Sequence, residues 1–334
     1  MRLTVALAAL LVLGVVAVGV AQATGGPHGS YEAATDMCAA CHRIHTAQYP
    51  KLLLNSNTTL CMTCHGPAAT GADTNVYDGV YEGTAHGTQQ AGLNSGGFAF
   101  AVQDTSLAGA PTSGAVTSAH EVEGITGYSP AATMWGAGAA NSGAGSAFDI
   151  YCTSCHNPHG GNNYRILKDL VSGVSITVTQ TDEASKSYTA PAYTKAPGTG
   201  QWEISSFCVA CHTRYTSTVG GSGGASSGDN MFTYRHRNDA PSGSLLKGAY
   251  YTFTAAISLP VSTVNGGPPT SSPDNRSMVC LTCHFAHGSK ASMGTESGGI
   301  TWPGGAGTPN GNSRSSLLRL DNRGVCQNCH NKGN

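Results

Sequence analysis

The chain has 334 residues, of which only 10% are charged, and its formal net charge at pH 7 is −1. This balance argues against nucleic acid as a partner and against an electrostatic site for a membrane surface. Glycine alone contributes 45 residues, and a chain so rich in small and polar residues has little aliphatic surface to offset the conformational entropy lost on folding. We therefore expect a core that is not built from side chains alone.

The N-terminus has the pattern of a secretory signal. Arg2 precedes an apolar run over 3–20, and Ala21-Gln22-Ala23 is a small-residue cleavage site. We expect a signal peptide over 1–23 and a single extended domain over 24–334. An uncleaved anchor is the alternative, because ~20 apolar residues can span a bilayer. The cleavage site favours removal, which leaves an exported protein with no stable membrane span.

Six Cys-x-x-Cys-His motifs follow, and they use all twelve cysteines. In such a motif the two thiols can add to the vinyl groups of a haem, and the histidine supplies one axial ligand to the iron. The expected haem thioethers form at Cys38, Cys41, Cys61, Cys64, Cys152, Cys155, Cys208, Cys211, Cys280, Cys283, Cys326 and Cys329. The expected proximal ligands are His42, His65, His156, His212, His284 and His330. The cofactor is six covalently attached haem c groups.

A Cys-x-x-Cys pair alone has other meanings, namely half of a zinc site, a redox-active dithiol or two disulfide half-cystines. The residue after each pair distinguishes them. Histidine makes up 13 of 334 residues, so finding it after all six pairs by chance has odds on the order of one in 10⁸. The haem interpretation is therefore strongly favoured.

Between the motifs we expect mostly irregular chain. The segment 66–151 is rich in Gly, Ser and Ala, which is typical of surface loops. Short strands are expected at 174–179 and 250–257, and a turn at 265–269. The predicted fold class is a multihaem c-type cytochrome that is mostly coil, with short helices at the motifs, a few small β-hairpins and a core of stacked haems. Without haem the chain is expected to be largely unfolded.

Seven histidines remain as candidates for the distal side of the six irons: His28, His45, His86, His120, His159, His236 and His287. Methionine is the rival distal ligand and would raise the potential, but several methionines sit inside or beside the motifs, where they cannot easily turn toward an iron. We therefore expect six-coordinate, bis-histidine haems of low potential. His28, near the start of the mature chain, is the expected spare.

Three of these histidines, His45, His159 and His287, lie three residues after a proximal histidine. On a helical turn, residues i and i+3 project from the same face, so the second histidine cannot reach the opposite side of the iron that the first one binds. It is expected to ligate a second haem alongside. Motifs one, three and five have this extension and motifs two, four and six lack it. The alternation predicts a continuous row of close haem pairs and an internally repeated plan.

With these residues in view, the chain resembles the OmcS family of hexahaem cytochromes. The resemblance covers the order of the motifs: an extended motif at 38–45, a plain one, a long segment with lone histidines, Cys-Thr-Ser-Cys-His-Asn-Pro-His-Gly at 152–160, Arg235-His236, Cys-Leu-Thr-Cys-His-Phe-Ala-His at 280–287 and a final plain motif. The resemblance implies polymerisation into an extracellular filament, in which His45 crosses to the His284 haem of an adjacent subunit. His28 is a further candidate for a terminal ligation.

The expected function is thus a secreted, bis-histidine electron carrier, not an enzyme, that forms a conductive filament outside the cell or at its surface. Its partners are other copies of itself and further multihaem cytochromes or extracellular acceptors. One alternative is a monomeric shuttle in the periplasm or at the cell surface, in which His45 ligates a haem of its own chain, such as that of His65. A less favoured alternative is a multihaem reductase of a small nitrogen oxide, which would need an iron with an open position.

Overall fold

The computed structural model describes residues 28, 38–67, 69, 71–82, 91–103, 112–125, 133–135, 144–178, 203–215, 262–263, 276–277, 279–291, 317–321 and 325. The expected signal peptide, the strand at 250–257 and the turn at 265–269 lie outside these residues, as do His86, His236 and motif six. Within the described ranges, no helix is long and apolar enough to cross a membrane.

Each described Cys-x-x-Cys-His motif forms or ends a short helix. These helices are α2 (Cys38–Cys41), α3 (Asn57–His65), α4 (Cys152–Cys155), α5 (Glu203–Val209) and α6 (Cys280–Cys283). The two cysteines of a motif are three residues apart, so one helical turn brings both thiols to the same side. The histidine amide then closes the turn, as in the 2.8 Å bond from His42 N to Cys38 O.

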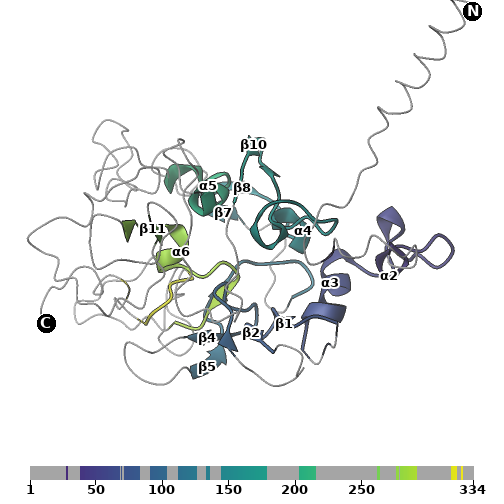
Figure 1. Cartoon of the computed structure of the whole chain (residues 1–334), viewed down its shortest axis with the longest axis horizontal. Helices are drawn as coiled ribbons and strands as arrows, with labels where there is room; N and C mark the ends of the chain where they lie inside the picture. The colour runs from purple at the N-terminus through teal and green to yellow at the C-terminus, as the bar shows by residue number, and fades with distance from the viewer. Residues whose placement is uncertain are drawn as a thin grey trace, which may run out of the picture.

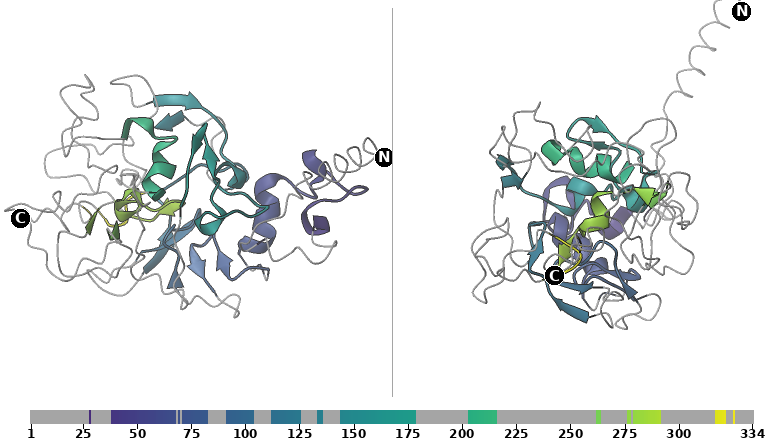
Figure 2. Two further views of the ribbon diagram at one scale, coloured as in Figure 1. Left: turned by 45° about the horizontal axis from the view of Figure 1, so that its top comes forward. Right: turned by 90° about the vertical axis from the view of Figure 1, so that its left-hand side faces the viewer.

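The motif helices follow one another along the longest axis of the molecule (Figure 1). In that view α2 and α3 lie toward one end and α5 and α6 toward the other, with α4 between them, and the same order is visible after a turn of 45° (Figure 2). Helices α3 and α4 contact each other, as do α5 and α6. The five described motifs therefore lie in a row, and the row of haem pairs itself stays a prediction.

Short antiparallel strands surround this row. A three-stranded sheet is built from β1 (Thr74–Asn75), β2 (Val80–Tyr81) and β3 (Ala91–Gly92). Four local pairs are β4 (Phe100–Gln103) with β5 (Thr112–Ala115), β7 (Thr133–Trp135) with β8 (Ala144–Ala147), β9 (Leu170–Val171) with β10 (Val174–Ser175), and β11 (Ser262–Thr263) with β12 (Arg276–Ser277). One further pair joins two strands that are far apart in the sequence, β6 (Ser118–Ala119) and β13 (Gly288–Ser289). Three short 3-10 helices are η2 (Pro50–Leu52), η3 (Tyr164–Ile166) and η4 (Thr213–Tyr215).

The described part of the segment 66–151 forms short strands with buried residues, so the expectation of a surface loop was wrong for these residues. It contains β1 to β8, and Ala101 and Val102 within it are buried. Glycine makes the close packing feasible: Gly96 has φ +67°, and a side chain there would collide with the backbone of Gly288. Strands of two to four residues are too short to show an alternating pattern, so the sequence did not reveal them.

The strand expected at 174–179 is also shorter than expected, since only Val174 and Ser175 pair with β9. The following residues bond instead to one side-chain amide: Asn163 Nδ2 donates to Ile176 O at 3.0 Å, and Val178 N donates to Asn163 Oδ1 at 2.8 Å. The alternating apolar residues Ile176 and Val178 do point into the core, because both are buried. Their backbone groups bond partly to the Asn163 side chain and partly to irregular chain, since Ile176 N donates to Asp169 O at 2.8 Å and Val178 O accepts from Tyr164 N at 2.7 Å.

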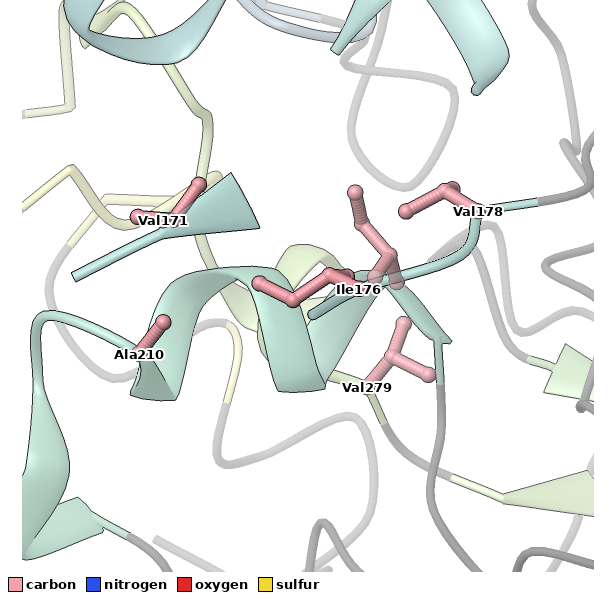
Figure 3. Close-up of a cluster of buried hydrophobic side chains, with 6 residues drawn as sticks. Val171, Ile176, Val178, Ala210 and Val279 are labelled. Carbon is pink, nitrogen blue, oxygen red and sulfur yellow. The ribbon is translucent and has the colours of Figure 1, made fainter. Parts of the chain in front are cut away.

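Two small side-chain clusters connect neighbouring motifs. The larger one joins the β9–β10 hairpin to α5 and to the residue before α6, and its buried members are Val171, Ile176, Val178, Ile204, Ala210 and Val279 (Figure 3). The smaller one, Phe98, Val122 and Ile125, packs against Met62 of motif two and Cys152 of motif three. Aliphatic packing thus lies at the junctions between motifs, as expected for a chain that is mostly coil with short helices and small hairpins.

Candidate haem-binding site

The three extended motifs, at 38–45, 152–159 and 280–287, share one backbone arrangement. In each, the amide after the proximal histidine donates to a later aliphatic residue: Arg43 N to Leu52 O at 2.8 Å, Asn157 N to Ile166 O at 2.7 Å, and Phe285 N to Leu317 O at 2.8 Å. A second bond returns to the second cysteine: Leu54 N to Cys41 O at 3.1 Å, Lys168 N to Cys155 O at 2.9 Å, and Arg319 N to Cys283 O at 2.9 Å. The motifs are therefore repeats in three dimensions.

We call 51–54, 165–168 and 317–319 the return segments. Their tight reversal uses positive φ at non-glycine residues, including 61° at Lys51 and 53° at Arg165. Sequence reasoning missed these segments. In motifs one and three the available signal is a basic residue followed by two aliphatic ones, nine residues after the proximal histidine. The third return segment lies much further along the chain, so no fixed spacing reveals it.

The return segments orient the proximal histidines. His42 Nδ1 bonds the Lys51 carbonyl at 2.8 Å, and His156 Nδ1 bonds the Arg165 carbonyl at 2.9 Å. A carbonyl only accepts, so Nδ1 must carry the proton and Nε2 is left with its lone pair. His65 in motif two uses Thr74 in the same way, with Nδ1 at 3.2 Å from Oγ1 and 3.4 Å from the carbonyl. This pattern leaves Nε2 of each of these three rings available to ligate a metal.

Four proximal histidines each face another histidine ring. The ring centroids are 6.1 Å apart for His42 and His159, 5.9 Å for His65 and His28, 6.3 Å for His156 and His287, and 6.2 Å for His212 and His120. A histidine nitrogen sits ~2.0 Å from a metal that it ligates, so two imidazoles on opposite sides of one iron have centroids about 6 Å apart. The spacing of all four pairs fits a bis-histidine haem iron.

Two of these pairs involve the extensions. His159 of motif three faces the proximal histidine of motif one, and His287 of motif five faces the proximal histidine of motif three. The ring of Phe98 stacks on His287 at 4.5 Å and fixes its orientation. The sequence argument required an extension histidine to leave its own haem, and the structure brings His159 and His287 to the preceding extended motif. Ligation of the iron itself stays a prediction.

The remaining candidates are placed differently. His28, the expected spare, lies opposite His65 and bonds the Pro158 carbonyl through Nδ1 at 3.0 Å. His45 is exposed, and no histidine ring in the described ranges lies opposite it. The structure therefore puts His28, and not His45, on the side of motif two. His86, His236, His330 and the cysteines of motif six are outside the described residues.

Burial keeps several of these rings neutral. It lowers the pKa of His65, His120 and His156, and burial together with the His156 and His120 rings lowers the pKa of His287 to about 3. Neutral imidazole is the form that ligates a metal. His65, His120, His156 and His287 are thus in the protonation state that iron requires at neutral pH.

The thiols of consecutive motifs lie close together. Cys152 beside Cys61 raises the pKa of the Cys61 thiol, and Cys280 beside Cys208 raises that of the Cys208 thiol. Burial, with Cys211 nearby, raises the pKa of Cys155 to about 11. The ten described cysteines form no disulfide. Motif two therefore adjoins motif three, and motif four adjoins motif five.

These donors fit covalently bound haem. Each of the five described motifs presents two thiols beside its proximal histidine, and Nδ1 is hydrogen-bonded in His42, His65 and His156, which leaves their Nε2 available. Four of the proximal histidines face a second imidazole across a gap that one iron would fill. Bound haem would supply one-electron redox chemistry. The chain would contribute thioether attachment, two axial ligands and the spacing between neighbouring groups.

One protein-family model agrees with this interpretation. The model of the doubled CXXCH motif matches residues 28–70 and 146–173. Two solved structures from Geobacter sulfurreducens are similar: an outer membrane cytochrome S filament, at 17% identity and a TM-score of 0.46, and the OmcS nanowires, at 16% identity and a TM-score of 0.39. Each comparison covers 89% of this chain and 98% of the other. No curated protein matches. The doubled CXXCH motifs indicate that this chain binds c-type haem covalently.

Proposed function

We propose that the protein is a secreted hexahaem cytochrome that polymerises into a conductive extracellular filament and carries electrons from the cell to external acceptors. The observation that carries the proposal is the position of His45. It is the counterpart of His159 and His287, which face histidines of a preceding motif, yet it is exposed and has no such ring opposite it in the described part of the chain. A second copy of the chain would supply the missing iron.

The six irons would each have two axial histidines. The facing pairs His42–His159, His65–His28, His156–His287 and His212–His120 support our assignment of four of these irons. For the irons of His284 and His330, the candidates are His45, His86 and His236, which leaves one histidine in excess. With both axial positions filled, no iron is open to a substrate, so the protein is proposed to be an electron carrier and not an enzyme.

The direction of the crossing follows from the repeat. His287 reaches from motif five to motif three, and His159 reaches from motif three to motif one. Continuing the series by one step, His45 reaches from motif one to motif five of a neighbouring molecule, where His284 is the proximal histidine. A head-to-tail contact of this kind does not close on itself, so it generates a filament. The two similar solved structures are themselves described as a filament and as nanowires.

The monomeric shuttle is the competing proposal. It assigned His45 to a haem of its own chain, with that of His65 as the example, but His28 lies opposite His65 at 5.9 Å. Export follows from the expected signal peptide over 1–23, which stays a prediction, as does the single domain over 24–334. A shuttle would be released as separate particles, whereas a filament subunit would not.

The experiment is negative-stain electron microscopy, with haem staining, of the secreted fraction from three strains: wild type, His45→Ala and the control Gln48→Ala. Gln48 is exposed in the same loop region and uses only its backbone amide, which donates to Leu53 O at 3.1 Å. We expect filaments from wild type and Gln48→Ala, and only separate particles from His45→Ala. Separate particles from wild type under varied growth conditions, or filaments from His45→Ala, would refute the proposal.

A further inference from the structure

Two of the extended motifs carry an arginine on the same backbone carbonyl. In motif one, Arg43 Nε donates to Ala39 O at 2.6 Å. In motif five, Arg319 Nε donates to Leu281 O at 2.7 Å. The accepting residue follows the first cysteine of its motif in both cases, although Arg43 directly follows a proximal histidine and Arg319 ends the third return segment. Each motif therefore has one guanidinium group on the helical turn that would hold its haem.

The surroundings of the two guanidinium groups differ. Arg43 is exposed, whereas Arg319 is only 7% exposed. A second nitrogen of Arg319, Nη2, donates to Asn94 O at 2.9 Å, and its guanidinium carbon lies 4.4 Å from the centre of the Phe285 ring. Phe285 directly follows the proximal histidine His284. A buried charge is screened by water and salt much less than an exposed one, so Arg319 acts more strongly on its motif than Arg43 does.

Motif three has a cation at the position equivalent to Arg319. Lys168 N donates to Cys155 O as Arg319 N donates to Cys283 O, and the equivalent residue of motif one is the uncharged Leu54. Burial raises the pKa of the Cys155 thiol to about 11, and the Lys168 ammonium opposes this rise. A charge at this position of a return segment is therefore felt at a sulfur that would attach the haem.

A haem gains one electron on reduction, so a fixed positive charge nearby stabilises the reduced form and raises the potential. We propose that Arg319 sets the potential of the haem at motif five and raises it above that of the haem at motif one. The cations of motif one, Arg43 and Lys51, are both exposed, and so is Asp321, the acidic residue nearest to Arg319 in the sequence. Electrons would be more stable at motif five than at motif one, which gives the row a direction. The inference needs bound haem but not the polymer.

The test is a spectroelectrochemical titration of the secreted, haem-loaded full-length protein. At a fixed applied potential, Arg319→Gln should lower the ratio of ferrous to ferric iron at one haem by about tenfold, which is about 59 mV for a one-electron couple. Arg319→Lys keeps the charge and should stay within about threefold of wild type. The matched control Arg43→Gln removes an exposed charge from the same carbonyl position and should change the ratio by less than about threefold. Haem content per chain should equal that of wild type in all three variants.

Equal shifts in Arg319→Gln and Arg43→Gln would overturn the proposal, as would an unchanged titration of Arg319→Gln with full haem content. If Arg319→Gln is not secreted with haem, Arg319→Lys and Leu54→Lys decide. Leu54→Lys installs in motif one the residue that motif three has at the equivalent position, and it should raise the ferrous-to-ferric ratio of one haem by about threefold or more. An unchanged titration of Leu54→Lys, or a tenfold drop in Arg319→Lys, would then refute the role of charge at this position.

Discussion

Motifs one and three have the same local structure and different surroundings. Both consist of a four-residue helix, a proximal histidine held by a return-segment carbonyl, and a histidine three residues later. In motif three that later histidine faces His42, whereas in motif one it is exposed. The short motif thus determines its own geometry, and the position of the motif in the row determines what its extension can reach.

The largest effect is expected from removing the haems, because motifs one and three would then both lose their structure and could no longer be compared. Chain produced without haem attachment should lose most of its helical signal and be digested rapidly by protease, because the described clusters of buried aliphatic side chains are small. Far-UV circular dichroism and limited proteolysis of the apo and haem-loaded proteins measure this. Protection equal to that of the haem-loaded protein would contradict it.

The next effect is that of His159→Ala, the counterpart of His45→Ala. Because His159 faces His42 within one molecule, we expect one high-spin haem per chain in both dispersed and polymeric protein, with filaments retained. Electron paramagnetic resonance and electron microscopy on the same samples test this. Loss of filaments together with an unchanged spectrum would show that the two histidines have exchanged roles.

The return segments of motifs one and three, 51–54 and 165–168, offer a smaller, paired test. Ile166 is half-buried and its counterpart Leu52 is 49% exposed. Ile166→Ser should lower the free energy of unfolding by about 1–3 kcal/mol through lost apolar burial, whereas Leu52→Ser should change it by less than about 0.5 kcal/mol. Denaturant titration in the His45→Ala background, which keeps the protein dispersed, measures both. Equal losses would mean that Leu52 is covered within the monomer.

The smallest effect is expected at Thr74, whose hydroxyl accepts from His65 Nδ1. Thr74→Val removes this acceptor while the carbonyl at 3.4 Å remains, so we expect about 1 kcal/mol of lost stability and a small rise in one haem potential. Thr63→Val is the control, because the Thr63 hydroxyl bonds only within its own helix and motif. Spectroelectrochemical titration should show a shift in the first variant and none in the second.

Much of the fold was predictable because it is local. The helices at the motifs follow from the spacing of two cysteines and a histidine, and all five described motifs have them. The segment 66–151 was misjudged, because its order depends on distant contacts such as β6 with β13 and Gly96 with Gly288. Such contacts leave no periodic pattern in a glycine-rich sequence.

The sequence by itself predicted which cysteines and proximal histidines would hold haem, and that an extension histidine would leave its own iron, because both predictions follow from geometry within eight consecutive residues. Only the tertiary structure decided that His28 lies opposite His65, that His120 lies opposite His212, and that carbonyls of motifs three and five orient them. These partners are far apart in the chain. Their meeting depends on how the motifs stack, which no local pattern encodes.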